Sequence, residues 1–249
     1  IGVRLVGSEM CIRDRNNSWM SFSDLMTGLM VIFMFVAISY ILEVQKAEQQ
    51  RQKVVTDFQD SKSAIYKDLR SAFDEEKKEW EMEIGKDLSI RFTNPQVIFA
   101  LGKSDVTPTF QKILNDFLPR YFNILLKEEY RTRIKEIRIE GHTDTLAIYS
   151  KSSDPYIGNV LLSQERSAKV LEYFRQMEYY KNLSEKQKEQ LQYWITANGL
   201  SYGRTLDDNK QESFLSHEPI NANYSRRVEF RIITTSEELI ENIVNDMQK

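Results

Sequence analysis

The sequence predicts an α/β or α+β domain that follows a single membrane helix and a helical stalk. Three observations predict this order. An apolar run with one charge covers residues 22–42, a proline-free stretch rich in charged and amide side chains covers 43–86, and short strand-like runs alternate with amphipathic helical ones from residue 88. We therefore expect three consecutive parts, of which the first lies in lipid and the last has its own core.

The overall composition limits the possible partners. The 249 residues include 34 basic and 37 acidic side chains, and the formal net charge is -3. A chain with this balance, spread along its length, is not expected to bind nucleic acid. The single cysteine, Cys11, excludes an intrachain disulfide and any multi-cysteine metal site.

Residues 1–21 form an N-terminal tail before the apolar run. Residues 1–15 lack an initiating methionine and show no periodicity, and they resemble translated sequencing-adaptor read-through. We expect this stretch to be an artefact without function, and a genuine cytoplasmic tail is the alternative.

Residues 22–42 are expected to form a transmembrane helix. At about 1.5 Å per residue this run crosses a hydrocarbon core of about 30 Å. The run is too long for a cleaved signal peptide, and no small-residue cleavage site follows it. Arg13 and Arg15 precede the span and Glu43 follows it, which favours a cytoplasmic N-terminus.

The stretch 43–86 is expected to be a helical stalk, because its composition favours helix. Apolar residues at heptad-like positions indicate a coiled coil between two copies, and a single solvated helix is the alternative. The apolar residues concerned are Val55, Phe58, Ile65, Leu69, Ala72 and Phe73.

Residues 88–234 are expected to fold as one domain, followed by a C-terminal helix or tail at 235–249. Apolar and polar alternation and strand-forming residues predict strands at 88–92, 134–140, 194–197 and 227–233. Amphipathic runs predict helices at 108–126, 161–178, 185–193 and 236–248. Ser184 and Gln187 have the spacing of a capping box for the third of these helices.

Asp24 lies about one turn inside the apolar run, where an ionised carboxylate costs about 2.5–3.5 kcal/mol. Helical spacing places Thr27, Gly28 and Val31 on the same face, and a face of small residues is expected to meet another protein. A carboxyl group enclosed there can take up and release protons. Alternatively, Asp24 simply caps the helix or reaches the interface.

The segment Trp19–Met30, WMSFSDLMTGLM, resembles the membrane segment of MotB-type stator subunits. The shared pattern is an aromatic residue, a small residue, Asp, and then an apolar residue, Met and Thr. The resemblance implies that Asp24 carries protons and that the chain forms a homodimer inside a pentameric ring of MotA-like subunits, a 5:2 complex.

Two motifs in the C-terminal part place a carboxylate and a guanidinium within possible reach of each other. Ile137–Asp144 reads IRIEGHTD, a strand with a polar tip, and Leu162–Ala168 reads LSQERSA at a helix. Arg166 could hold the carboxylate of a zwitterionic amino acid such as diaminopimelate, while Asp144 accepts from its ammonium. A structural salt bridge between the two is the alternative.

These motifs, followed by Arg226–Phe230 (RRVEF), resemble in their order the OmpA-like peptidoglycan-binding domains over residues 88–234. The resemblance implies an α+β fold, an α/β sandwich with a mixed sheet. It also implies that Asp144 and Arg166 bind peptidoglycan, with Asn159, Leu162 and Thr143 beside them. Two features depart from the pattern: Ser225 replaces the usual Asn, and the link at 146–156 is long.

No enzyme activity, cofactor or metal is expected. His142 and His217 are the only histidines, and neither belongs to a cluster of ligands in the sequence. The chain has no phosphate-binding loop, nucleophile elbow or paired catalytic acids.

The combination of parts resembles flagellar MotB and the ZorB family of Zorya anti-phage defence, and residues 182–203 and the long link are more similar to ZorB. This resemblance implies a proton-driven motor subunit in the bacterial inner membrane, with a periplasmic domain bound to peptidoglycan and a surrounding ring of ZorA-like subunits. A flagellar stator subunit and a passive wall tether are the alternatives. The sequence leaves open whether the ion is H+ or Na+.

Overall fold

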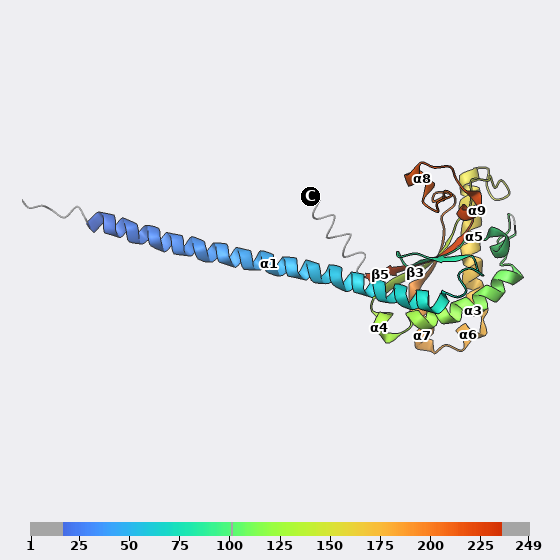
Figure 1. Ribbon diagram of the computed structural model, residues 1–249, viewed down its shortest axis with the longest axis horizontal. Helices are drawn as coiled ribbons and strands as arrows, with labels where there is room; N and C mark the ends of the chain where they lie inside the picture. The colour runs from blue at the N-terminus through green and yellow to red at the C-terminus, as the bar shows by residue number, and fades with distance from the viewer. Residues whose placement is uncertain (1–16, 101, 236–249) are drawn as a thin grey trace, which may run out of the picture. The chain divides into compact units, whose positions relative to one another are not determined.

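The computed structural model describes residues 17–100 and 102–235, which divide into two compact units between Lys53 and Val54 (Figure 1). The first unit is helical, and the second contains a five-stranded sheet with its covering helices. The predicted helix at 236–248 lies outside the described residues.

Helix α1 runs from Asn17 to Phe73 and forms the whole described part of the first unit. Among the described residues, α1 is the one helix long and apolar enough to cross a membrane, with a mean hydropathy of 2.4 in its most apolar window. Its large apolar side chains between Phe22 and Leu42 are exposed in the isolated chain. That pattern is typical of a helix whose solvent is lipid.

The last turns of α1 belong to the second unit. Ile65, Leu69 and Phe73 follow a helical spacing and are fully buried in the hydrophobic core. They therefore pack inside this chain and offer no surface to a coiled-coil partner. The side chain of Phe58 lies outside the described residues.

The compact domain thus begins earlier in the chain than the predicted range 88–234. Ser61 is already buried, and strand β1, Met82–Ile84, lies inside the predicted stalk 43–86. The prediction placed this segment in the stalk because an apolar stripe on a helix can be buried either by a second helix or by a domain core, and here the domain core buries it.

The sheet is mixed, as expected from the resemblance. Its strand order is β1-β2-β5-β3-β4, in which β3 and β4 are parallel and the other neighbours are antiparallel. The four predicted strands are confirmed within two residues at each end, and β1 was not predicted. The remaining strands are β2 (Ser89–Phe92), β3 (Ile134–Gly141), β4 (Ile195–Gly199) and β5 (Val228–Thr234).

The long helices of the domain are close to their predicted positions. Helix α3 spans Pro108–Leu125, and α7 spans Glu185–Trp194 with the predicted capping box of Ser184 and Gln187. Helix α5 spans Pro155–Gln176 and begins before the predicted residue 161, because Asp154 caps it and Pro155 occupies its first position. The short helices are α2 (Pro95–Ile98), α4 (Glu128–Arg131), α6 (Glu178–Lys181), α8 (Ser213–Ser216) and α9 (Ala222–Ser225).

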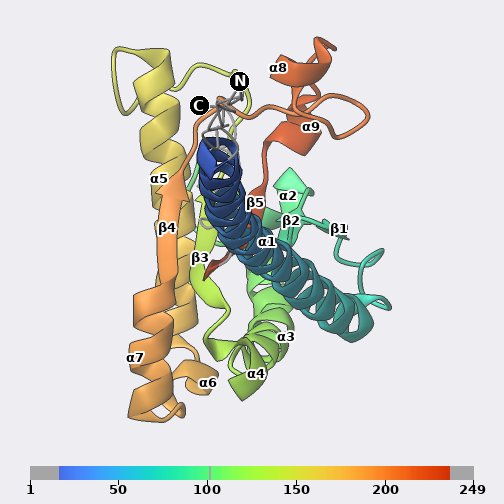
Figure 2. The ribbon, with the colours of Figure 1, turned by 90° about the vertical axis from the view of Figure 1, so that its left-hand side faces the viewer.

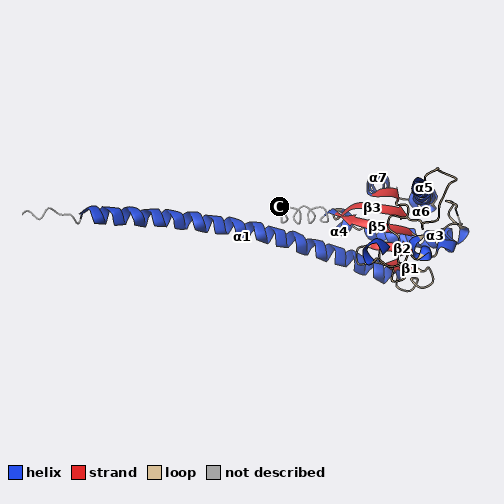
Figure 3. Cartoon of the chain, turned by 90° about the horizontal axis from the view of Figure 1, so that it is seen from above, coloured by secondary structure: helices blue, strands red, loops and turns tan. Residues whose placement is uncertain are grey.

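Aromatic side chains hold α3 and α5 against the sheet. Phe117 of α3 contacts Phe92 and Phe230 on the central strands at centroid distances of 5.1 and 5.2 Å. Phe122 of α3 stacks on Phe174 of α5 at 4.4 Å. Figure 2 shows α5 beside β4, and Figure 3 shows the strands grouped in one sheet. This packing fixes the end of β3 next to the middle of α5, where the two sequence motifs lie.

Candidate functional site

The residues of the predicted membrane site are exposed on helix α1. Asp24, Thr27, Gly28 and Val31 all lie in α1, so the predicted spacing places them on one side of it. The Thr27 hydroxyl donates to the carbonyl of Ser23 at 2.8 Å and so is satisfied within the helix. A Cβ added at Gly28 would meet no atom within 4 Å in the described structure. The face can therefore accept a neighbouring helix at close range.

In the domain, the two predicted motifs contact each other through backbone atoms. A Cβ at Gly141, the last residue of β3, would overlap the carbonyl oxygen of Ser163 in α5. Beyond Gly141 the backbone N–H of His142 donates to the carbonyl of Arg227 at 3.0 Å, and that of Thr143 donates to Ser201 at 2.9 Å. These contacts fix the polar tip that carries Asp144.

Asp144 is held in a turn and pairs with an arginine. Its Oδ1 accepts from the backbone N–H of Leu146 at 3.1 Å, and its Oδ2 lies 3.5 Å from Nη1 of Arg226. Its side chain is only 13 % exposed. The carboxylate therefore has one fixed backbone donor and one charged partner, and the partner could be exchanged for a ligand cation.

Arg166 projects from α5 and is buried. Its Nε donates to the carbonyl of Lys103 at 3.0 Å, and its guanidinium lies 4.9 Å from the centroid of the Phe99 ring. Burial lowers the pKa of Arg166 to about 10, Asp144 opposes this shift, and the positive charge of Arg226 adds to it. Arg166 thus remains charged at neutral pH, in a position where water shields it poorly.

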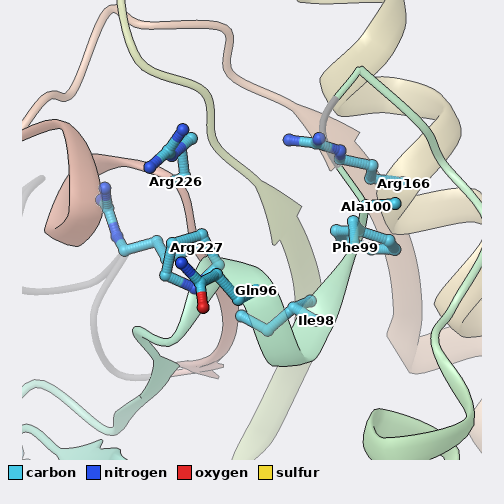
Figure 4. A pocket seen from close by; sticks show the side chains of 8 residues that line it. Gln96, Ile98, Phe99, Ala100, Arg166, Arg226 and Arg227 are labelled. Atoms are coloured by element: carbon cyan, nitrogen blue, oxygen red, sulfur yellow. The ribbon is translucent and has the colours of Figure 1, made fainter.

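Arg166 and Arg226 line one cavity of about 360 Å³. Figure 4 shows the guanidinium of Arg166 extending toward Arg226 from the opposite side of the cavity. One wall is α2, whose first turn is capped by Asn94. The lining residues are Pro95, Gln96, Ile98, Phe99, Ala100, Arg166, Arg226 and Arg227. Guanidinium groups beside an apolar wall suit a ligand that carries a carboxylate on a short aliphatic chain.

The structure brings Asp144 and Arg166 to the same region but does not pair them. Among the described residues, no carboxylate lies within ion-pair distance of Arg166, and Asp144 contacts Arg226 instead. The sequence motif RRVEF contains Arg226 but indicates no role for it in the site. The signal that could have identified it is the adjacent pair Arg226–Arg227. Both arginines line the cavity, but Arg227 is paired with the buried Glu229 and Arg226 contacts Asp144.

The other predicted neighbours have supporting positions. Asn159 is buried, and its Nδ2 donates to the carbonyls of Leu146 and Pro155 at 2.9 and 3.1 Å. It therefore ties the long link after Asp144 to the start of α5. Leu162 is buried, and the buried hydroxyl of Thr143 has no hydrogen-bond partner in the described structure.

His142 belongs to a buried cluster that the sequence did not reveal. Its Nε2 lies 3.8 Å from Glu140 and 3.7 Å from Glu229, so the three side chains could supply metal ligands. However, the Nε atoms of Arg91 and Arg227 lie 3.3 and 3.2 Å from Glu229. Glu229 is therefore already paired with two guanidiniums, which compete with a metal ion for its carboxylate.

The same cluster sets the protonation state of His142. Burial and the charge of Arg227 lower the pKa of His142 well below its ordinary value, although Glu229 opposes them. The imidazole is therefore neutral at neutral pH.

The chain is similar to two curated proteins along most of its length. It is 33 % identical over 246 residues to the Zorya protein ZorB of Escherichia coli strain Crooks, covering 98 % of this chain and 99 % of that protein. It is 28 % identical over 224 residues to the Zorya protein ZorB of Escherichia coli O139:H28, covering 86 % and 79 %. No protein-family profile matches the chain.

Solved structures give more distant matches. A putative MotB-like protein from Desulfovibrio vulgaris has 20 % identity and a TM-score of 0.47, with 71 % of this chain and 93 % of that chain covered. The periplasmic domain of Helicobacter pylori MotB has 15 % identity and a TM-score of 0.38, with 65 % and 83 % covered.

Proposed function

Because this chain belongs to the ZorB family of Zorya proteins, we propose that it is the membrane-anchored B subunit of an ion-driven, stator-like complex in anti-phage defence. The observation that carries the proposal is Asp24, an acidic residue inside the one described helix that can cross a membrane. An intramembrane carboxyl group is costly in lipid and calls for a function. The proposed subunit has no catalytic role of its own.

The membrane part of the proposal concerns proton transfer. Asp24 binds and releases protons where α1 meets a ring of five ZorA-like subunits, and two copies of this chain stand inside the ring. The small side chains at Thr27 and Gly28 support close approach of such a neighbour. Each charge that crosses 100 mV releases about 2.3 kcal/mol, which is the energy source for rotation of the ring.

The domain part of the proposal concerns anchoring. The chain crosses the inner membrane once, with its N-terminus in the cytoplasm and its domain in the periplasm. There Arg166 and Asp144 hold the stem peptide of peptidoglycan. The cavity beside Phe99 supports this assignment, because it combines a buried guanidinium with an apolar wall. Fixed to the wall, the B subunits provide the stationary part against which the ring turns.

The Asp24→Asn variant tests the motor function. Expressed with its cognate partners in a phage-sensitive host, it should abolish protection while membrane levels of the protein stay equal to wild type. Met26→Leu, on a different face of α1, is the matched control and should protect normally. Protection measured as plaque counts decides the outcome. Full protection by Asp24→Asn would contradict the motor.

A passive wall tether is the second candidate, because the cavity lies in the domain and does not depend on Asp24. Arg166→Ala should remove binding to purified peptidoglycan in a sedimentation assay under either candidate. Arg175→Ala, an exposed change on the same helix, is the control. If Asp24→Asn keeps protection and Arg166→Ala loses it, the tether replaces the motor.

A further inference from the structure

Arg226 lines the cavity and is only partly satisfied by groups of the chain itself. Its Nη1 lies 3.5 Å from Asp144, and its Nη2 donates to Oδ1 of Asn223 at 2.8 Å. Its Nε is buried and has no hydrogen-bond partner in the described structure. A buried donor without a partner is unfavourable, so the groups of the chain itself leave the guanidinium of Arg226 incompletely bonded.

The charges that face the cavity do not cancel. Arg166 and Arg226 are both positive and Asp144 is the one carboxylate that contacts either of them among the described residues. Arg227 also lines the cavity, but Glu229 neutralises it at 3.2 Å. The cavity therefore carries an excess of one positive charge before any ligand binds.

A ligand with one carboxylate and one ammonium has no net charge, so it would leave the excess positive charge in the cavity. It would also take away the counter-ion of Arg226. If the ligand carboxylate pairs with Arg166 and the ligand ammonium pairs with Asp144, then Asp144 no longer balances Arg226. The Arg226 side chain, 26 % exposed, would then be a largely desolvated cation without a counter-ion. A second carboxylate on the same ligand removes this cost.

Resting on the proposed wall-binding function, we propose that Arg226 is a specificity-determining residue that binds a second carboxylate of the stem peptide. The preferred ligand is then a peptide with a zwitterionic amino-acid end and a free carboxylate on the neighbouring residue. In such a complex Arg166 binds the first carboxylate and Asp144 binds the ammonium. Arg226 gives up its contact with Asp144 and binds the second carboxylate instead. Amidation of that second carboxylate weakens binding.

Two synthetic peptides test the proposal by isothermal titration with the full chain in detergent. The first, called the acid, is L-Ala-γ-D-Glu-meso-diaminopimelate with the carboxylate at its peptide-linked centre converted to the amide, so that the diaminopimelate end is a simple zwitterion. The second, called the amide, is the same peptide with the α-carboxylate of glutamate also converted to the amide. Wild type should bind the acid about tenfold to a hundredfold more tightly than the amide, as expected for one charged hydrogen-bonded contact. Arg226→Gln should bind both peptides with the affinity that wild type has for the amide.

Two further variants separate the possible outcomes. Arg175→Gln should keep the preference for the acid, because Arg175 is exposed at the far end of α5. Arg166→Gln should weaken binding of both peptides. Thermal unfolding of each variant checks that the fold is retained.

Equal affinity of wild type for the two peptides, or equal weakening of both by Arg226→Gln, would overturn the role of Arg226 and leave wall binding intact. No binding of either peptide by wild type would overturn both the wall-binding function and this inference.

Discussion

The backbone of Gly141 lies directly against the carbonyl oxygen of Ser163, so that no side chain fits between the end of β3 and helix α5. This contact joins the segment that carries Asp144 to the helix that carries Arg166. Gly141 belongs to β3 and Ser163 to α5, so neither backbone can move aside without disturbing the sheet or the helix. The geometry of the cavity therefore depends on the absence of a side chain at Gly141.

The Gly141→Ala variant should be destabilised by about 1–3 kcal/mol, because the added methyl group must displace α5. Chemical denaturation of the full chain in detergent, followed by tryptophan fluorescence, measures the change; Trp194 is buried in the domain. Gly203→Ala is the control, since a Cβ there meets only ordinary contacts at 3.5 and 3.7 Å. Equal stability of the two variants would contradict the close approach.

Leu69→Ala should destabilise the domain by about 2–5 kcal/mol, the usual cost of a cavity in a packed core. Leu69 is fully buried against residues of its own chain. Val44→Ala, an exposed change in the same helix, should have little effect. If Leu69 instead formed a seam between two chains, the variant would dissociate and the loss would depend on protein concentration in the denaturation series.

His142 should make the stability of the domain depend on pH in the mildly acidic range. Burial and Arg227 lower the pKa of His142 in the folded state, whereas in the unfolded chain it returns to about 6.5. The unfolded state therefore binds more protons below about pH 6.5. The free energy of unfolding should be fully present above that pH and should fall as the pH drops, by up to about 1.4 kcal/mol per unit.

Denaturation curves between pH 7.5 and 5, at steps of about half a unit, measure this dependence. The His142→Gln variant should show a smaller slope than wild type. His217→Gln, which alters an exposed residue, should keep the wild-type slope. Identical slopes for all three proteins would show that His142 is not the titrating group.

Asn159→Ala should free the link between Asp144 and α5. The variant loses the donor to the carbonyls of Leu146 and Pro155, at a cost of about 1–3 kcal/mol if both stay buried. Retention on purified peptidoglycan should fall as well, because Asp144 loses its fixed position. Asn209→Ala, at an exposed position, is the control. Unchanged retention at lowered stability would restrict Asn159 to a structural role.

Sequence periodicity predicted the elements of the domain because each has a signal within its own residues. The alternation in β3 and the capping box of α7 are local patterns. Strand β1 was missed because three residues show no periodicity. The apolar stripe that includes Leu69 was visible, but its period is the same for a coiled coil and for a core, so the surface that covers it could not be predicted.

The candidate site was only partly predictable for a related reason. The motifs around Asp144 and Arg166 indicated a shared location, and the contact of Gly141 with Ser163 shows how the fold produces it. The partner of Asp144 is set by how α9 leads into β5 and directs Arg226 toward the cavity. A pairing between side chains so far apart in the chain has no local sequence signal. The roles of these residues in binding stay predictions.

Helix α2, which forms one wall of the cavity, is held at both ends by hydrogen bonds. The Asn94 side chain bonds the first turn of α2, and it also donates to Glu81 at 2.7 Å. At the other end, the carbonyl of Ile98 accepts from Thr107 at 3.2 Å. In the proposed complex with a stem peptide, such preorganisation spares the entropy of ordering a loop. The proposed anchoring would then need no rearrangement of this wall before the ligand is held.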